Sequence, residues 1–571
     1  MVILLRVIYI VERNNDNRTS FLGGILLKKG YLKLLSLVML LTMALFLAAC
    51  GSDDANSSGE TETDTGTPTT ENTDDSSSST PQVLVFGRGA DSVSLDPGIV
   101  TDGESFKVTQ NLFETLLNFG EKDTTIHPGL AKEWAVSDDG LTYTFQLQEG
   151  VKFHDGTDFN AEAVIKNVDR WKGGKEEDFY YFNSMFKAEG EDIISEVTAE
   201  GDYTVIFKLS RPQAPFLKNL AMSPFGIGSP TAFEAAGDKF GDNPVGTGPF
   251  KFTEWKRNDS ITIEKFEDYW EEGLPKLDKV IFRSIPDNSA RLNELIAGHI
   301  DLADGVNPSD GKTVEGNSEL QLIERPSMNI GYLGLTNTRA PFDNKLVRQA
   351  VNYAINKQAI VDAFFEGRAE VAANPMPPSI SGYNDAISPY PYDPEKAKAL
   401  LAEAGYDGKE IELWAMPVPR PYMPDGAKVA EVIQKNLEDV GIPSKIVTFE
   451  WATYLDKAKD GEADAFMLGW TGDNGDADNF IYTLLDKDNI GSNNYAYYSN
   501  DEVHDLLIKA QSETDENVRN DLYKKAQEII HEDAPWVPLA HSTPLLAAKA
   551  GVKGFLPHPT GSDKLDNVSI E

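Results

Sequence analysis

Cysteine is nearly absent from this chain of 571 residues, where it occurs once, at Cys50. A single cysteine excludes an intrachain disulfide and a cysteine-rich metal site, and it leaves the redox compartment unreadable from cysteine pairing. Basic residues are also scarce, with 52 Lys and Arg against 91 Asp and Glu and a formal net charge of −39. Such a charge repels nucleic-acid phosphates and anionic membrane surfaces, so the sequence predicts neither as a partner.

Signatures of catalysis are missing as well. The chain has no G-x-S-x-G elbow, and His531-Glu532 lacks the second histidine of a zinc-protease helix. The run from Gly305 to Thr313 imitates a phosphate-binding loop but has one residue too many between its glycines. His127 and His154 lie beside turns and are interpreted as structural. We therefore expect no catalytic residue, no metal and no cofactor.

An apolar run from Leu34 to Ala49 follows three lysines and ends in the sequence LAAC at Cys50. This order is typical of an export signal, and the run is shorter than the ~20 residues that a membrane-spanning helix needs. LAAC resembles the lipobox of bacterial lipoproteins, in which the signal is cut before a cysteine that then carries lipid. The sequence predicts a signal peptide over residues 1–49 and lipidation, such as palmitate, at Cys50. The leader before the lysines is longer than a signal needs, so we hypothesise a translation start near Leu26 or Leu27.

Residues 50–82 contain eight acids, no base and almost no apolar side chain after the cysteine. Such a segment cannot bury enough surface to offset its ordering entropy, so it is predicted to be a disordered tether. A lipid anchor, a polar tether and no second span indicate a protein on the outer face of the cytoplasmic membrane. The anchor is then its only membrane contact, and a Gram-positive envelope is favoured.

Strand signals dominate the folded chain from residue 83 to about residue 325. The stretches 141–148, 204–209 and 260–266 alternate apolar and polar residues, with helices expected at 161–170 and 289–297. After about residue 326, helices alternate with short strands. The run 344–365 has helical spacing, and a further helix begins at Pro394, capped by Asp393 and stopped by Gly405.

Residues 411–470 form the most informative run. Strands are expected at 411–416, 445–449 and 464–470, separated by helices at 427–442 and 452–459. With right-handed crossovers this β-α-β-α-β order gives a parallel sheet in which the first and third strands are neighbours. A ligand crevice is expected beyond the carboxyl ends of these strands.

Two loops at that edge carry opposite charges. GWTGDNGDADNF (469–480) holds Asp473, Asp476 and Asp478 without a base, and PVPRPYMPDG (417–426) holds Arg420. Asp476 and Asp478 are interpreted as loop residues satisfied by turns and caps, while the role of Asp473 stays open. A carboxylate and a guanidinium facing one crevice can be an ion pair, a catalytic pair, part of a metal site, or a clamp for a zwitterion.

Several motifs resemble those of the large extracellular solute-binding proteins of peptide and nickel ABC importers, family 5. They are PGLAKEWAVSDDGLTYTFQLQEGVKFHDG, NPVGTGPF and PFDNKLVRQAVNYAINKQAI, and the lower half, with LWAMPVPRPYMPDG and GWTGDNGDADNF, is most similar to dipeptide-binding members. The resemblance implies an α/β, two-lobed fold of the periplasmic-binding type II class, with a hinge and an extra subdomain in lobe I. Lobe I is expected at 83–325 plus 543–571, and lobe II at 326–542.

The resemblance also implies a site. In that family the aspartate of GDNGD, here Asp473, holds a dipeptide's amino group, and the arginine of RPY, here Arg420, holds its carboxylate. A dipeptide's charged ends are ~7 Å apart, which suits one acid and one base on neighbouring strand ends. Further positions that match ligand neighbours are Tyr422, Trp470, Thr471, Gly472 and, in a diverged loop of lobe I, Thr101. A family member has a cysteine pair where this chain has LLDKDNIGSNNY, which leaves the rigidity of that loop open.

The leading interpretation is a monomeric, non-catalytic receptor that closes on a dipeptide and presents it to the permease subunits of an ABC transporter. A haem, glutathione or oligopeptide receptor of the same fold is the main alternative. A surface peptide hydrolase would need a nucleophile with its base or a metal site, and neither is evident. A purely structural or adhesive surface protein would not explain an acid and a base at the edge of a parallel sheet.

Overall fold

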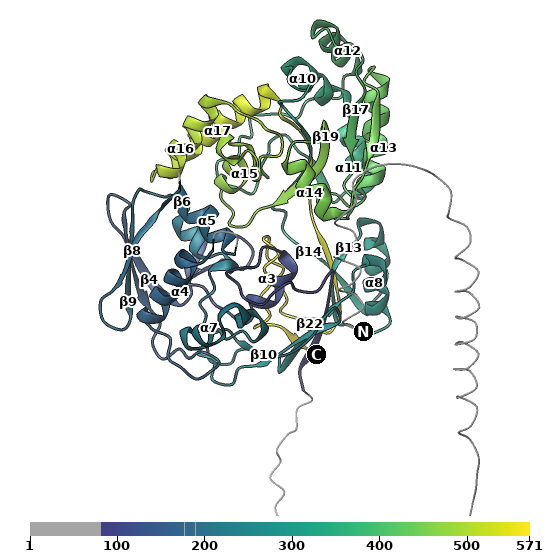
Figure 1. Ribbon diagram of the computed structural model, residues 1–571. Helices are drawn as coiled ribbons and strands as arrows, with labels where there is room; N and C mark the ends of the chain where they lie inside the picture. The colour runs from purple at the N-terminus through teal and green to yellow at the C-terminus, as the bar shows by residue number, and fades with distance from the viewer. Residues whose placement is uncertain (1–80, 176–177, 189) are drawn as a thin grey trace, which may run out of the picture. The chain divides into compact units, whose positions relative to one another are not determined.

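The computed structural model describes residues 81–175, 178–188 and 190–571 (Figure 1). The described chain belongs to one compact unit, Ser79–Glu571. The expected signal peptide, Cys50 and the tether as far as residue 80 lie outside the described residues. The sequence places Gln82 in the tether, but the structure ties it to the fold. Its backbone N–H donates to Asp278 over 2.8 Å, and its side-chain oxygen accepts from the N–H of Ile570 over 2.8 Å.

A seven-stranded sheet forms the first part of the fold (Figure 1). Its order is β10 (Phe250–Lys256), β11 (Ser260–Lys265), β12 (Lys279–Ser284), β1 (Val83–Arg88), β13 (Leu302–Val306), β21 (Leu545–Lys549) and β14 (Leu320–Glu324). The central strand β1 is parallel to β12 and β13, and the other pairs are antiparallel. β21 comes from the last part of the chain, so the two ends of the compact unit share one sheet.

A separate four-stranded antiparallel sheet has the order β4 (Ala131–Val136), β5 (Thr142–Leu147), β9 (Thr204–Leu209) and β8 (Ile194–Ala199). Tyr143, Phe145 and Leu147 of β5 are buried and alternate with half-buried residues, as the period-two pattern predicts. Helices α4 (Ala161–Gly173) and α5 (Tyr180–Phe186) share an aromatic-rich core with this sheet. This core is distinct from the one under the seven-stranded sheet.

A six-stranded sheet forms the other part. Its order is β16 (Ala369–Val371), β20 (Trp536–Ser542), β15 (Asn329–Leu335), β19 (Ala465–Thr471), β17 (Ile411–Trp414) and β18 (Ser444–Val447). β17 is parallel to both β18 and β19. The prediction that the first and third strands of the run 411–470 are neighbours is therefore confirmed. The sheet as a whole is mixed rather than parallel, because β15 pairs antiparallel with β19 and β20. Helices α13 (Gly426–Asp439) and α14 (Trp451–Lys459) connect the parallel strands.

The run 344–365 forms two helices, α10 (Lys345–Ala354) and α11 (Lys357–Phe364). The apolar spacing continues through the break, but the side chain of Asn356 accepts from the N–H of Ala359 and starts a new helix. The expected cap at Asp393 is confirmed, because its carboxylate accepts from the N–H of Lys396 over 2.9 Å.

The remaining elements are short or cover the sheets. The helices are α3 (Gly103–Thr109), α6 (Phe216–Leu220), α7 (Pro230–Ala236), α8 (Asn288–Ile296), α9 (Gly311–Glu315), α12 (Pro394–Glu403), α15 (Asp478–Leu485), α16 (Asp501–Ser512) and α17 (Glu516–Asp533). Four 3₁₀ turns lie at Ser223–Phe225, Gly237–Asp242, Pro308–Asp310 and Lys487–Asn489. The two-stranded pairs are β2 (Leu117–Phe119) with β3 (Ile126–Pro128), β6 (Lys187–Ala188) with β7 (Glu191–Asp192), and β22 (Val552–Lys553) with β23 (Ser569–Ile570). Across the described part of the chain, every helix is too short or too polar to span a bilayer.

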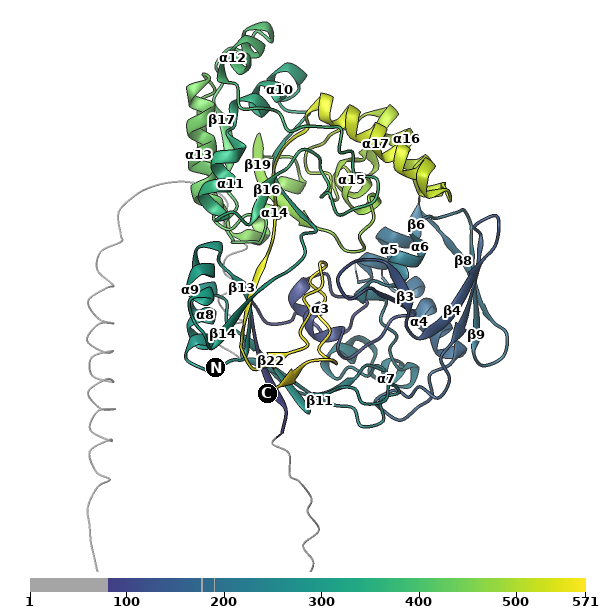
Figure 2. The same cartoon turned by 180° about the vertical axis from the view of Figure 1, so that it is seen from behind.

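Two chain segments cross between the large sheets, one from β14 to β15 and one from β20 to β21 (Figure 2, the latter in yellow). Asn329 and Ser542 stand where these segments meet the six-stranded sheet. The amide of Asn329 donates to the backbone oxygen of Ser542 over 2.9 Å and accepts from its N–H over 3.0 Å. Both residues are buried. The crossing is therefore fixed by side-chain hydrogen bonds as well as by the sheet.

Candidate ligand-binding site

The Arg420 loop leaves the carboxyl end of β17, and the Asp473 loop leaves the carboxyl end of β19. These strands are parallel neighbours, with Leu413 beside Ala465 and Trp414 beside Phe466. The two loops therefore start at the same edge of the six-stranded sheet, as the sequence predicts.

The carboxylate of Asp473 is held from two sides. Asn479 donates through Nδ2 to Oδ2 over 3.0 Å, and the hydroxyl of Tyr181 donates to Oδ1 over 3.2 Å. The side-chain oxygen of Asn479 also accepts from the backbone N–H of Asp473 over 2.9 Å. Burial raises the pKa of Asp473 to about 6, against the two side-chain hydrogen bonds, which lower it. No described cation neutralises this carboxylate.

Arg420 occupies a tight turn in which its backbone and that of Met423 exchange two hydrogen bonds of 3.1 and 2.9 Å. Its side chain is exposed, and the guanidinium carbon lies 5.5 Å from the ring centroid of Trp451. Among the described residues it has no carboxylate partner within ion-pair distance, so its charge is available to a ligand.

Tyr422 fixes the Arg420 turn to the sheet. It is 9% exposed and lies against two glycines, because a Cβ on Gly331 would come within 2.3 Å of the Tyr422 backbone oxygen and one on Gly469 within 2.3 Å of its ring. Burial raises the pKa of Tyr422, while Arg420 lowers it in part. The hydroxyl of Ser542 donates to the backbone oxygen of Pro421 over 2.8 Å, which ties the same turn to the crossing segments.

The other residues of this loop that were expected near the ligand are Trp470, Thr471 and Gly472, which lie just before Asp473. The indole N–H of Trp470 donates to the side-chain oxygen of Asn479 over 3.1 Å, and Thr471 pairs with Asn329 on β15. The N–H of Gly472 donates to the backbone oxygen of Met328 over 2.9 Å. Trp470 and Thr471 are partly exposed, whereas Gly472 is buried. These positions orient the Asp473 loop through its backbone and through Asn479.

Thr101 is exposed and precedes α3. The next residue, Asp102, caps that helix by accepting from the N–H of Ser105 over 2.9 Å. The charge of Asp102 also acts on Tyr181, whose pKa is raised well above its usual value chiefly by burial. Thr101 therefore precedes a residue whose charge acts on Tyr181. Among the described residues, no hydrogen bond joins Thr101 to Asp473 or Arg420.

The two other loop aspartates are bonded to side chains from elsewhere in the chain, rather than through turns and caps alone. Arg519 forms two hydrogen bonds of 2.7 and 2.6 Å with Asp476, which is 3% exposed. Burial alone would raise the pKa of Asp476, but Arg519 outweighs it and lowers the pKa to about 2. Asp478 accepts from the amide of Gln511 over 3.0 Å, and burial raises its pKa to about 7.

Residues from the first half of the chain contact this loop and were not predicted from the sequence. Lys218 Nζ donates to the backbone oxygen of Gly475 over 2.7 Å, and the amides of Asn219 and Asn474 are 2.8 Å apart. Together with Tyr181, Lys218 and Asn219 contact residues 473–475. No local pattern signals these contacts, whereas Asn479 lies inside the acidic loop and was recognisable as a polar neighbour.

Other titratable side chains outside this loop are bonded to protein groups. His154 is bonded to the backbone oxygen of Gly248 over 2.9 Å, and burial lowers its pKa to about 4. Asp486, Asp488 and His504 are grouped closely enough to suit a metal ion, but a ring nitrogen of His504 lies within hydrogen-bonding distance, 3.0 Å, of Asp486 Oδ1.

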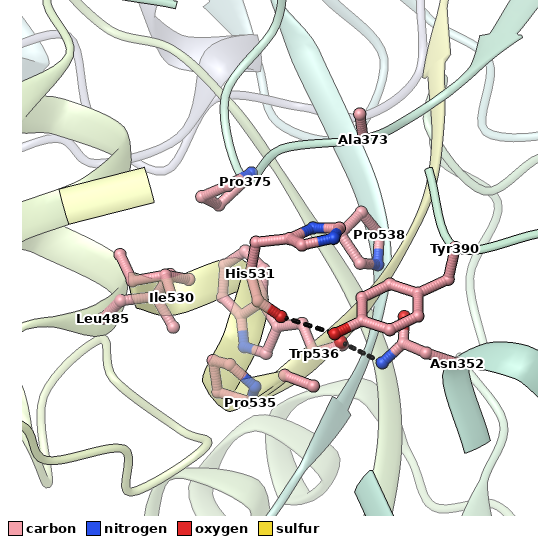
Figure 3. A pocket seen from close by; sticks show the side chains of 11 residues that line it. Asn352, Ala373, Pro375, Tyr390, Leu485, Ile530, His531, Pro535, Trp536 and Pro538 are labelled. Atoms are coloured by element: carbon pink, nitrogen blue, oxygen red, sulfur yellow. Dashed lines mark hydrogen bonds between the residues drawn. The ribbon is translucent and has the colours of Figure 1, made fainter. Parts of the chain in front are cut away.

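A small cavity is lined in part by Trp536 and Pro538 of β20, and no residue of the two loops lines it (Figure 3). Its volume is about 20 Å³, which holds about one water molecule. Tyr390 donates from its hydroxyl to the backbone oxygen of His531 over 2.8 Å along its wall. None of the expected ligand contacts lines it. The lining residues are Asn352, Ala373, Pro375, Tyr390, Leu485, Ile530, His531, Ala534, Pro535, Trp536 and Pro538.

The bacterial extracellular solute-binding proteins, family 5 (middle region), match residues 125–492 of this chain. The chain belongs to this family. Among curated family relatives, the dipeptide-binding protein of Escherichia coli (strain K12) is 40% identical over 512 residues, covering 86% of this chain and 95% of that protein. Heme-binding protein A of Haemophilus influenzae is 37% identical over 561 residues, covering 95% and 100%.

Among solved structures, a periplasmic binding protein associated with an ABC transporter of Helicobacter pylori, in complex with the peptide STSA, has a TM-score of 0.76. It is 38% identical and covers 86% of this chain and 98% of that chain. The two-lobed α/β fold of the periplasmic-binding class is thereby confirmed. Members of family 5 are solute-binding proteins of the extracytoplasmic space.

Proposed function

We propose that this family 5 protein captures dipeptides outside the cytoplasm and presents them to the permease of an ABC transporter. The observation that carries the proposal is the pair of uncompensated charges, Asp473 and Arg420, on loops from two neighbouring parallel strands. Elsewhere in the same loop, Asp476 is fully paired with Arg519. Two unpaired opposite charges at one sheet edge suit a zwitterion better than any internal role.

In this proposal Asp473 holds the ligand's ammonium group and Arg420 its carboxylate. The ends of an extended dipeptide are ~7 Å apart, so a longer peptide would misplace one charge. Affinity then comes from the charged ends and the backbone, and side chains of many kinds are tolerated. Tyr422 supports Arg420, Trp470, Thr471 and Gly472 support Asp473, and Thr101 contributes from the facing lobe.

The proposal keeps the lobe boundaries at 83–325 plus 543–571 for lobe I and 326–542 for lobe II. Closure occurs by rotation about the two crossing segments. It also keeps the remaining expectations: a monomer, exported by a signal peptide over 1–49 and anchored by lipid at Cys50 to the outer face of the membrane. The relative named for haem binding and the one crystallised with STSA make haem and short oligopeptides the second candidates. The exposure of Arg420 favours the oligopeptide among these, because that end of the site is open.

The deciding experiment is calorimetric titration of the full-length protein in detergent, refolded from guanidinium to remove carried ligand. The titrants are Ala-Ala, N-acetyl-Ala-Ala, Ala-Ala-amide and tetra-alanine. We expect tight binding of Ala-Ala and at least tenfold weaker binding of both blocked forms and of tetra-alanine. Equal binding of all four peptides would overturn the two-ended clamp. Failure of all four, with a Soret shift on adding haem, would favour the haem receptor.

A further inference from the structure

Tyr181 lies at the amine end of the proposed site but comes from the other side of the fold. It belongs to α5, packs edge-on against Phe106 at 5.9 Å between ring centroids, and is 7% exposed. Its hydroxyl crosses to the loop after β19 and donates to Asp473 over 3.2 Å. This is the one bond that the described lobe I side chains make directly to that carboxylate.

The hydrogen bonds already made by Tyr181 and Asp473 determine which groups they can still offer to a ligand. A tyrosine hydroxyl has one proton, and here Asp473 Oδ1 takes it. Toward a ligand the hydroxyl oxygen can then only accept. An ionised carboxylate also only accepts, and each of its two oxygens already receives one bond, from Tyr181 and from Asn479. The free positions around Asp473 and Tyr181 are therefore acceptors.

We propose that Tyr181 is a specificity-determining residue for the ligand's amine end, which it supplies with a second acceptor while fixing the orientation of Asp473. The inference rests on the proposed function, in which Asp473 holds the ammonium group. A protonated primary amine has three donors and satisfies both acceptors. An acylated amine carries a carbonyl oxygen that would face acceptors only, so the closed site rejects it.

The same geometry couples recognition to closure. Lys218 and Asn219 of lobe I hold Gly475 and Asn474, the residues that follow Asp473. Separation of the lobes would remove Tyr181, Lys218 and Asn219 from this loop together. The two-acceptor amine site is therefore complete only in the closed form.

The neighbouring residue, Tyr180, provides a matched control for Tyr181. Tyr180 also forms a hydrogen bond across the lobes, accepting from the amide of Asn493 over 2.8 Å, but its hydroxyl donates no described hydrogen bond to Asp473. Tyr181→Phe and Tyr180→Phe thus each delete one hydroxyl and one inter-lobe hydrogen bond. The titratable groups that act on this cluster are Asp473, Tyr180, Tyr181 and Asp102.

The test is calorimetric titration of Ala-Ala and N-acetyl-Ala-Ala into the full-length wild type, Tyr181→Phe, Tyr180→Phe and Asp473→Asn proteins between pH 5 and pH 7. Thermal unfolding of each variant checks that it is folded. For Tyr181→Phe we expect about ten- to hundredfold weaker binding of Ala-Ala at pH 7, the range for a hydrogen bond to a charged group. We expect a smaller preference for Ala-Ala over its acetyl form.

The pH profile separates recognition from mere packing. The bond from Tyr181 lowers the pKa of Asp473, so its loss should move the acid limb of binding to higher pH. Tyr180→Phe should change affinity less than threefold and leave the limb in place. If the two phenylalanine variants behave alike while Asp473→Asn loses binding, the role of Tyr181 is overturned and the clamp stands. If Asp473→Asn binds like wild type, both proposals fall.

Discussion

Asp473 and Asp476 stand three residues apart in one loop, yet their electrostatic surroundings are opposite. Burial without a cation raises the pKa of Asp473 to about 6, whereas Arg519 brings the pKa of Asp476 to about 2 despite its burial. Of these two carboxylates, Asp473 is easily protonated and Asp476 stays charged. In the proposed function, Asp473, which has no cation partner, holds the ligand's amine, while Asp476 carries the internal ion pair with Arg519.

The pKa of Asp473 predicts an acid limit to binding. An ammonium group needs the ionised carboxylate, which is mostly present at pH 7 and mostly protonated at pH 5. The dipeptide keeps its own amine protonated over this range. We expect the affinity for Ala-Ala to be about tenfold lower at pH 5 than at pH 7, measured by calorimetry. A flat profile over this range would show that Asp473 does not hold the amine.

Arg420→Ala should weaken Ala-Ala binding about ten- to hundredfold, because one charge-assisted contact to the carboxylate is lost from an exposed side chain. Arg420→Lys should retain part of the affinity, since an ammonium cannot make the two parallel bonds of a guanidinium. The control is Ala-Ala-amide, whose weaker binding should be the same in wild type and variant. An equal loss for both ligands would assign Arg420 a structural role instead.

Asp476→Asn should destabilise the protein by roughly 3–5 kcal/mol, because it leaves the largely buried Arg519 without its counter-ion. Asp478→Asn is the matched control and should cost less than ~1 kcal/mol, since this carboxyl has a pKa of about 7 and an asparagine oxygen can still accept from Gln511. Urea unfolding at pH 7 measures both.

The pH dependence of stability provides a second test of Asp476 and Asp478. The depressed pKa of Asp476 contributes stability above pH ~3.8 that is lost as the pH falls toward 2. The raised pKa of Asp478 acts in reverse, so stability declines as the pH rises from ~4 to 7. Asp478→Asn should therefore be most favourable at the high-pH end. Equal costs for the two asparagine variants would contradict this assignment.

Gly469→Ala should disturb the site through the Arg420 turn. The added methyl would lie 2.3 Å from the Tyr422 ring and 2.4 Å from the backbone oxygen of Ile330, which cannot move aside without shifting β15. We expect a loss of roughly 1–3 kcal/mol in stability together with weaker Ala-Ala binding, measured by thermal unfolding and calorimetry. Gly173→Ala, with nothing within 4 Å of the new methyl, should stay within ~0.5 kcal/mol. Wild-type behaviour of Gly469→Ala would show that the Tyr422 contact is loose.

Cys50→Ser tests the anchor. In a bacterial host, we expect wild-type protein to incorporate labelled palmitate and to fractionate with membranes. The serine variant should incorporate none and remain uncut or appear in the medium. Labelling of the serine variant would contradict lipidation at this position.

The β-α-β-α-β run was predictable because its strands and helices are short, strongly periodic and contiguous in sequence. Right-handed crossovers then determine which strands are neighbours, and this places Arg420 and Asp473 at one edge. The break before α11 was not predictable from periodicity, because the apolar spacing runs through it and only Asn356 marks the cap. The pairing of β15 with β19 was likewise not predictable from the run 411–470, because β15 lies outside that run in sequence.

The amine end shows where sequence reasoning stops. Tyr181 and Asp473 are separated by 292 positions, and Lys218 and Gly475 by 257. Contacts of this kind join segments far apart in the chain, and no local spacing encodes them. The local sequence does not distinguish Tyr181, whose hydroxyl donates to Asp473, from Tyr180, whose hydroxyl accepts from Asn493.

Both charged groups of the site belong to loops on a single sheet, whereas Tyr181 arrives from the opposite lobe. Capture and closure can therefore be separate kinetic steps. In the proposed function, an encounter with the open six-stranded lobe would engage both ends of a ligand, so the association rate should depend on Asp473 and Arg420. The contacts added on closure act later and should govern how long a ligand stays bound.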